Sequence, residues 1–178
     1  MSAPPSPDPQ AGPDAPIWLL DVDGVLNALA QHPDPLVWPD YRHTRARAQR
    51  AWFPITYSPT ACARVREWHQ AGLVEIRWLT TWGHEANTSL AGELGLPQAE
   101  VVGLPGSSQV WWKLPMAQQV HLAEPHRRLV WTDDQLQFCP PALDWLDELG
   151  GSALGLTPEP TTGLSPADLA AIEEFLRS

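Results

Sequence analysis

The residues best suited to chemistry are four aspartates in two separated pairs, each placed just after a short apolar run. Asp21 and Asp23 form the first pair, and Asp133 and Asp134 form the second. Neighbouring carboxylates repel one another unless a cation lies between them, so the pairs predict a site for a hard divalent ion. Because no His or Cys accompanies these oxygen ligands, they favour Mg²⁺ over zinc.

Phosphoryl transfer is the chemistry that such a site suits. A carboxylate can attack phosphorus and form an acyl phosphate, which divides one difficult displacement into two easier ones. Charge in the transition state spreads over the equatorial oxygens, so a hydroxyl and a cation are expected around them. Thr80, which follows another apolar run, and Lys113 have suitable types, with Thr81 as the alternative to Thr80. Lys113 is the only lysine of the chain, which favours a specific role over a solvated helix position.

The elements that must position these residues alternate along the chain. Alternation of strands and helices predicts an α/β, three-layer Rossmann-like fold, with a parallel sheet and helices on both faces. The carboxyl ends of such strands meet at one edge, where ligands bind. Apolar runs predict strands at residues 17–20, 74–79, 101–102, 128–131 and 153–156. Capping and stop signals predict helices from the Ser58 cap to Gly72, over 85–94, 113–122 and 141–149, and after the Ser165 cap.

The length of 178 residues, the hydrophobic fraction of 43% and the 10 Trp favour one globular domain. Residues 1–16 contain little to bury and predict a disordered leader. The domain then spans residues 17–178. Within it, residues 28–57 form an irregular stretch rich in Pro and Arg, which predicts a flap or minimal cap insert.

Four motifs together resemble those of the haloacid dehalogenase (HAD) superfamily. The run DVDGVLN at residues 21–27 is similar to its first motif, Thr80 to the second, Lys113 to the third, and the run TDD at residues 132–134 to the acidic fourth. The motifs occur in the family's order. The resemblance implies a Mg²⁺-dependent phosphomonoester hydrolase that works through an aspartyl-phosphate.

Two further runs resemble a narrower group, the small HAD-like domains grouped with RNA-repair proteins. These are WLTTWGHEAN at residues 78–87 and TGL at residues 162–164. This similarity implies a nucleic-acid end as an alternative substrate.

The superfamily resemblance also implies a role for each acidic residue. Asp21 would attack phosphorus, and Asp23 would protonate the leaving alcohol and later activate water. The Asp21 carboxylate, the backbone carbonyl of Asp23 and Asp133 would hold Mg²⁺. Asp134 would bind the ion directly or through water.

Four of the eleven cations lie in the insert, at Arg42, Arg45, Arg47 and Arg50. They predict either a mobile flap that draws a phosphorylated substrate over the site or a solvated loop on an acidic surface. Thr81 and Trp82 are further candidate substrate contacts, and Trp82 and Trp52 could stack on a base.

An insert of this length is too short for a full cap domain, so we expect an open site. Small phosphate esters and a nucleic-acid end both remain candidate substrates. A catalytically idle HAD-like domain that binds a partner through the flap is the alternative from another functional class.

Composition excludes several other classes. The net charge of -10 argues against a generally basic nucleic-acid-binding surface. No run approaches the roughly 18 apolar residues of a membrane span. The two cysteines form neither a zinc motif nor a disulfide framework, and the amino terminus does not resemble a secretory signal. We therefore expect a cytoplasmic protein with no membrane association and no evident obligate protein partner.

Overall fold

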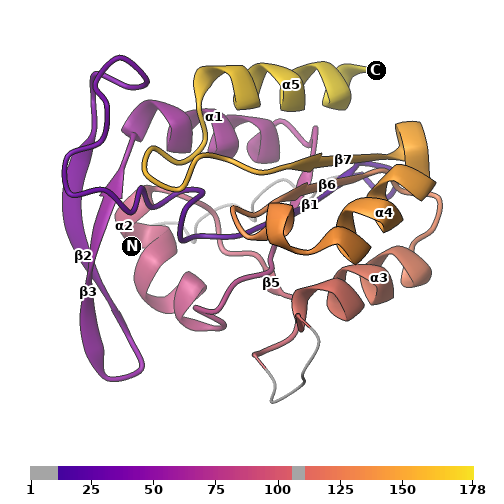
Figure 1. The fold of residues 1–178 in the computed structure, drawn as a ribbon, viewed down its shortest axis with the longest axis horizontal. Coiled ribbons are helices and arrows are strands. Elements are labelled where there is room, and N and C mark those ends of the chain that lie inside the picture. The colour runs from indigo at the N-terminus through magenta and orange to yellow at the C-terminus, as the bar shows by residue number, and fades with distance from the viewer. Residues whose placement is uncertain (1–11, 106–110) are drawn as a thin grey trace, which may run out of the picture.

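The computed structural model describes residues 12–105 and 111–178, and a five-stranded parallel sheet lies at its centre (Figure 1). The strand order is β5–β4–β1–β6–β7. The sheet consists of β1 (Ile17–Leu20), β4 (Glu75–Trp78), β5 (Glu100–Val101), β6 (Leu129–Thr132) and β7 (Ala153–Leu156). The five predicted strands are thus confirmed, and no end is shifted by more than one residue. Helices flank the sheet, as in a Rossmann-like α/β fold.

Alternate residues of β1 point into two separate apolar clusters. Trp18 and Leu20 belong to the cluster that contains residues of α1 (Pro59–Gln70), α2 (Gly92–Leu94) and α5 (Pro166–Arg177). Ile17 and Leu19 belong to the cluster that contains residues of α3 (Lys113–Ala123) and α4 (Pro140–Leu149). A strand covered on both faces needs apolar residues at every position, which explains the continuous run in the sequence.

Local signals set the ends of several helices. The Ser58 side chain accepts a hydrogen bond from the Ala61 N–H at the start of α1, and Ser165 forms a capping box with Asp168 at the start of α5. The helix predicted over residues 85–94 differs from a regular one. It consists of the π-helical segment η1 (Ala86–Ala91) followed by the single turn of α2, which ends at Gly95. The two remaining short elements are 3-10 turns, η2 (Leu136–Phe138) and η3 (Gly150–Ser152).

The insert contains a hairpin at one side of the molecule (Figure 1). Strands β2 (Arg42–Ala48) and β3 (Ala51–Tyr57) pair antiparallel along their whole length. The sequence pattern indicated no strands here, and the structure places these two within the predicted insert. Arginines at exposed positions and a proline within β3 obscured the alternating pattern, and proline is tolerated at the edge of a sheet.

Residues 1–11 of the predicted leader lie outside the described residues. The last part of the leader is described, and it contacts the domain. The Arg127 side chain donates to the Ala15 carbonyl over 2.7 Å, and the Glu75 N–H donates to the Pro16 carbonyl over 2.9 Å. The contacts of the domain therefore begin slightly before Ile17. Within the described part of the chain, no helix has the length and apolarity needed to cross a membrane.

Candidate active site

Three neighbouring strands bring the predicted site residues to one edge of the sheet. The ladder continues one residue past β1 and β6, because the Asp21 N–H donates to the Thr132 carbonyl over 3.2 Å and the Asp133 N–H to the Leu156 carbonyl over 3.1 Å. On the other side of β1, β4 ends two residues before Thr80. Strand order reverses beside β1, so this edge is where parallel sheets bind ligands.

Asp21, Asp133 and Asp134 form a compact carboxylate cluster. One oxygen from each lies within 4.8 Å of the others. Lys113, the first residue of α3, places its Nζ 2.7 Å from Asp21 Oδ2 and 2.5 Å from Asp133 Oδ2. All four side chains are buried. The Lys113 ammonium thus contacts two of the three carboxylates where little water reaches them, and a divalent cation would balance the remaining negative charge.

Burial and mutual repulsion perturb the titration of this cluster. Burial raises the pKa of Asp21, and the Lys113 charge opposes this shift only in part. Burial, together with the charge of Asp21, raises the pKa of Asp133 to about 7, and the same two causes raise the pKa of Asp134. Burial alone would lower the pKa of Lys113, but the charges of Asp21 and Asp133 outweigh it and raise that pKa. The Lys113 ammonium therefore stays charged, but it does not by itself balance the negative charge of the three carboxylates.

The two candidate threonines occupy different positions. Thr80 is buried, and its hydroxyl is among the hydrogen-bonding groups that act on the Asp21 carboxylate. Thr81 is exposed and lines a cavity beside Asp23. Of the two, Thr80 is therefore the threonine whose hydroxyl interacts with Asp21.

Gly24 permits the close approach of the two aspartate pairs. Its φ is +73°, and a Cβ there would lie 2.5 Å from Asp134 Cγ. Any larger residue would clash with Asp134 and would also strain the backbone.

Asp23 is held apart from the carboxylate cluster. Its Oδ1 accepts from Asn27 Nδ2 over 2.8 Å, and its Oδ2 accepts from Trp82 Nε1 over 3.0 Å. Asn27 in turn accepts from the Thr56 N–H of β3 over 2.8 Å. Among the described residues, the Asp23 carboxylate is not a member of the cluster. This leaves the backbone carbonyl as the Asp23 group available to a metal.

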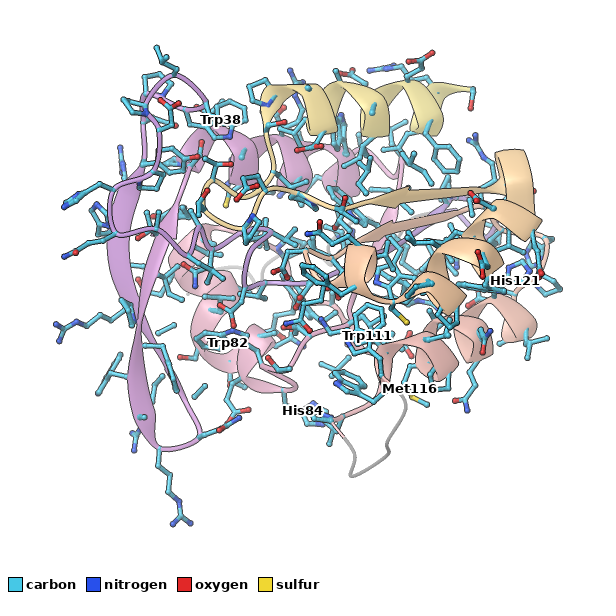
Figure 2. The ribbon with its side chains drawn as sticks, in the orientation of Figure 1. Trp38, Trp82, His84, Trp111, Met116 and His121 are labelled. Atoms are coloured by element: carbon cyan, nitrogen blue, oxygen red, sulfur yellow. The ribbon has the colours of Figure 1, made fainter. Side chains whose placement is uncertain are left out.

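A cavity of about 160 Å³ lies beside Asp23. It is lined by Asp23, Ala48, Gln49, Phe53, Thr81 and Trp82. The Phe53 ring meets the Trp82 ring edge-on, with 5.8 Å between centroids. Trp82 lies on the side of the site that faces the hairpin (Figure 2), and it is 5% exposed. Little of its ring is open to a stacked base, so its main contacts are with Asp23 and Phe53.

The predicted arginine contacts lie away from this cavity. Successive residues of a strand point to opposite faces. Ala46 is buried and pairs with Phe53, whose ring contacts Trp82, so these residues mark the face toward the site. Arg45 and Arg47 lie on the opposite face, and both are exposed. These two side chains therefore do not line the cavity beside Asp23, and their predicted contact with the substrate stays a prediction.

Arg42 lies at the exposed start of β2. Within the described residues, its side chain forms no hydrogen bond or ion pair, and it does not line the cavity beside Asp23. Its predicted substrate contact stays a prediction.

Three residues that support the site were not singled out for that role from the sequence. Trp111 stacks on Trp131 of β6, with 5.4 Å between ring centroids and planes 8° apart, and Lys113 Nζ lies 5.8 Å from the Trp111 ring centre. Trp111 lies toward α3 (Figure 2). Asn27 belongs to the DVDGVLN run, but nothing in its spacing indicates that it bonds Asp23.

Gly163 is the third supporting residue. It belongs to the TGL run and has a φ of +71°, and a Cβ there would lie 2.5 Å from the Val25 carbonyl. The neighbouring Leu164 N–H donates to that carbonyl over 2.8 Å. This segment therefore packs against the loop that follows β1.

Comparisons of the chain with protein-family models, with curated proteins and with solved structures found no match. The function must therefore be argued from the site itself.

Proposed function

We propose that the chain is a Mg²⁺-dependent phosphomonoester hydrolase of the HAD type, with a three-layer Rossmann-like fold and Asp21 as the nucleophile. The observation that carries this proposal is the buried cluster of Asp21, Asp133 and Asp134 around Lys113 at the carboxyl edge of the sheet. Perturbed titratable groups at such an edge are typical of catalytic sites.

The donor set fits a hard divalent cation. Asp21, Asp133 and the Asp23 carbonyl would hold Mg²⁺, and Asp134 would bind it directly or through water. Burial raises the pKa of all three carboxyls, and the charge of Asp21 adds to this shift at Asp133 and Asp134, so a cation between them would be favourable. When bound, the ion offsets the repulsion between an anionic nucleophile and an anionic phosphate.

The reaction divides into two displacements. In the first, an Asp21 oxygen forms a bond to phosphorus while the ester P–O bond breaks, and the Asp23 carboxyl gives its proton to the leaving oxygen. In the second, the ionised Asp23 takes a proton from water as the water oxygen bonds to phosphorus. The bond from Asp21 to phosphorus then breaks, which regenerates the carboxylate and releases inorganic phosphate.

The remaining residues bind and orient the substrate. Lys113 and Thr80 would contact the phosphate oxygens, where transition-state charge develops. Asn27 and Trp82 fix the direction of the Asp23 carboxylate. The cavity beside Asp23 would receive the part of the substrate next to the scissile bond, because the leaving oxygen must lie within reach of that acid.

A terminal phosphate of a nucleic acid is the second candidate substrate. The observation that favours it is the insert, whose regular structure is a two-stranded hairpin that leaves the site more open than a cap domain would. To separate the two candidates, the same enzyme is assayed on phosphorylated oligonucleotides and on a small aryl phosphate, and the two rates of turnover are compared. A catalytically idle domain would turn over neither.

The test of the nucleophile is Asp21→Asn. We expect phosphate release in Mg²⁺ to fall by at least about 10³-fold, as when one member of a catalytic unit is removed. Wild-type enzyme quenched during turnover should carry a phosphoryl group on Asp21, detected by mass spectrometry, and the variant should not. Asp144→Asn makes the same chemical change at an exposed position of α4 and should retain activity. An Asp21→Asn enzyme with full activity would refute the assignment.

A further inference from the structure

The outer face of the hairpin is formed by His43, Arg45, Arg47, Trp52 and Pro54, which share one side of the two strands. Trp52 lies directly opposite Arg47 and is 65% exposed. The hairpin stands at the side of the molecule, with its inner face toward the site (Figure 1). The outer face is therefore available to a partner that does not enter the catalytic cavity.

The arginines of the hairpin are distinguished by their lack of partners. Among residues 12–105 and 111–178, the side chains at Arg42, Arg45, Arg47 and Arg50 form no ion pair and no hydrogen bond. Every other basic residue forms at least one such contact: Arg64, Arg66, Arg77, Lys113, Arg127, Arg128 and Arg177. The cations without a partner are thus concentrated on a single element.

The charged residues in and around the hairpin also favour a basic surface. Residues 42–57 contain four arginines and no Asp or Glu, although the chain has a net charge of -10. Two carboxylates from the body contact this element, and both are engaged by other donors. Glu85 accepts from the Gln49 N–H over 3.3 Å, and Glu93 accepts from the Thr44 hydroxyl over 3.2 Å. The hairpin is therefore a local basic surface on an acidic protein.

We propose that the outer face of the hairpin binds a single-stranded nucleic acid. Unpaired guanidinium groups attract the phosphates of the backbone, and Arg45 and Arg47 lie about 6.7 Å apart along β2, which suits successive phosphates of an extended strand. Trp52 offers an exposed indole face to an unstacked base. An acidic protein segment would use the cations but would leave the exposed aromatic ring without a matching group.

This proposal does not rest on the phosphatase reaction. The strand would lie on the face opposite to Phe53 and Trp82, so binding can be measured without turnover. The probe is a fluorescein-labelled single-stranded oligonucleotide of about 12 nucleotides, as DNA and as RNA, titrated in EDTA and followed by anisotropy. We expect binding to weaken as salt rises, because phosphate contacts release counterions.

The arginine test compares two double variants with the same change in net charge. Arg45→Ala/Arg47→Ala should lower the slope of log affinity against log salt by about 1.4, since each single-strand phosphate contact contributes about 0.7. Arg64→Ala/Arg177→Ala removes two exposed cations from α1 and α5 and should leave the slope unchanged. Equal losses in both variants, or an oligonucleotide that does not bind at low salt, would overturn the proposal.

The aromatic test separates nucleic acid from other polyanions. Trp52→Ala should weaken oligonucleotide binding at least about fivefold, the lower end of the cost of losing one base stack, whereas Trp52→Phe should retain most of the affinity. Binding of inorganic polyphosphate, which has no bases, should not change in Trp52→Ala. If Trp52→Ala binds the oligonucleotide as wild type does, base recognition is refuted. Circular dichroism checks that each variant is folded.

Discussion

At the scale of single residues, the site depends on one ammonium that serves two carboxylates. Lys113 Nζ contacts Asp21 and Asp133, and all three side chains are almost fully buried. Such a cluster tolerates the loss of its positive member poorly, because a buried charge without a partner is costly. The single lysine therefore has a structural role that does not depend on the proposed reaction.

Lys113→Met tests this role through stability. We expect the metal-free variant to lose about 3 kcal/mol of unfolding free energy at pH 8, the scale for removing one partner of a buried ion pair. The loss should be smaller at pH 5, because Asp133, with its pKa raised to about 7 by burial and by Asp21, is then protonated. Urea denaturation at both pH values in EDTA measures the difference. Equal losses at pH 5 and pH 8 would contradict it.

At the scale of elements, the loop after β1 must approach the loop after β6 closely enough to join the two aspartate pairs. Gly24 makes this approach possible, and the segment around Gly163 supports the first loop from its other side. The hairpin is linked to the same loop through Asn27, which bonds both the Thr56 N–H and Asp23. The proposed acid is thus positioned jointly by the loop after β1, the β3 strand and Trp82.

Gly24→Ala should therefore affect the metal site as well as stability. The new Cβ displaces Asp134, so we expect weaker Mg²⁺ binding by isothermal titration calorimetry, in addition to a cost of about 1–2 kcal/mol for the positive φ. Gly150→Ala is the matched control, because Gly150 also has a positive φ but has open space around the added Cβ. It should lose stability and keep its Mg²⁺ affinity. If both variants bind Mg²⁺ as wild type does, Asp134 is not a ligand.

At the scale of the whole molecule, the pH dependence of stability follows from the balance of these carboxyls. The folded state raises the pKa of Asp21, Asp133 and Asp134, so it binds protons more tightly than the unfolded state. Stability should then fall as pH rises from the ordinary value of 3.8 through about 7. At Glu75 and Glu124, burial would raise the pKa, but their ion pairs outweigh it and lower the pKa. The stability that these ion pairs contribute is lost only in more acidic solution.

In EDTA, we expect the unfolding free energy to fall by about 3 kcal/mol between pH 5 and pH 8. Excess Mg²⁺ should reverse most of this fall at pH 8, because a ligand that binds only the folded state stabilises it. Thermal denaturation over this pH range, with and without Mg²⁺, measures both effects. Stability that stays flat or rises with pH in EDTA, or that does not respond to Mg²⁺, would contradict the proposed site.

Much of the fold was predictable because its signals are local. Ser58 and Ser165 cap their helices through bonds within three residues, and the apolar run 17–20 indicates a strand covered on both faces. The parallel sheet followed from the alternation of strands and helices. The hairpin was missed because its inward positions carry residues such as Ala46 and Ala48, which do not form a recognisable apolar pattern.

The sequence by itself determined the types of the reactive groups and their placement at strand ends, because each depends on a few neighbouring residues. Only the tertiary structure decided which groups meet. Lys113 and Asp21 are 92 residues apart, and their contact depends on the order of strands in the sheet. Trp82 donates to Asp23, and Arg45 lies on the face of the hairpin away from the cavity. The packing of the hairpin against the domain determines the direction of both side chains. Such contacts between distant segments arise from packing, which no local pattern encodes.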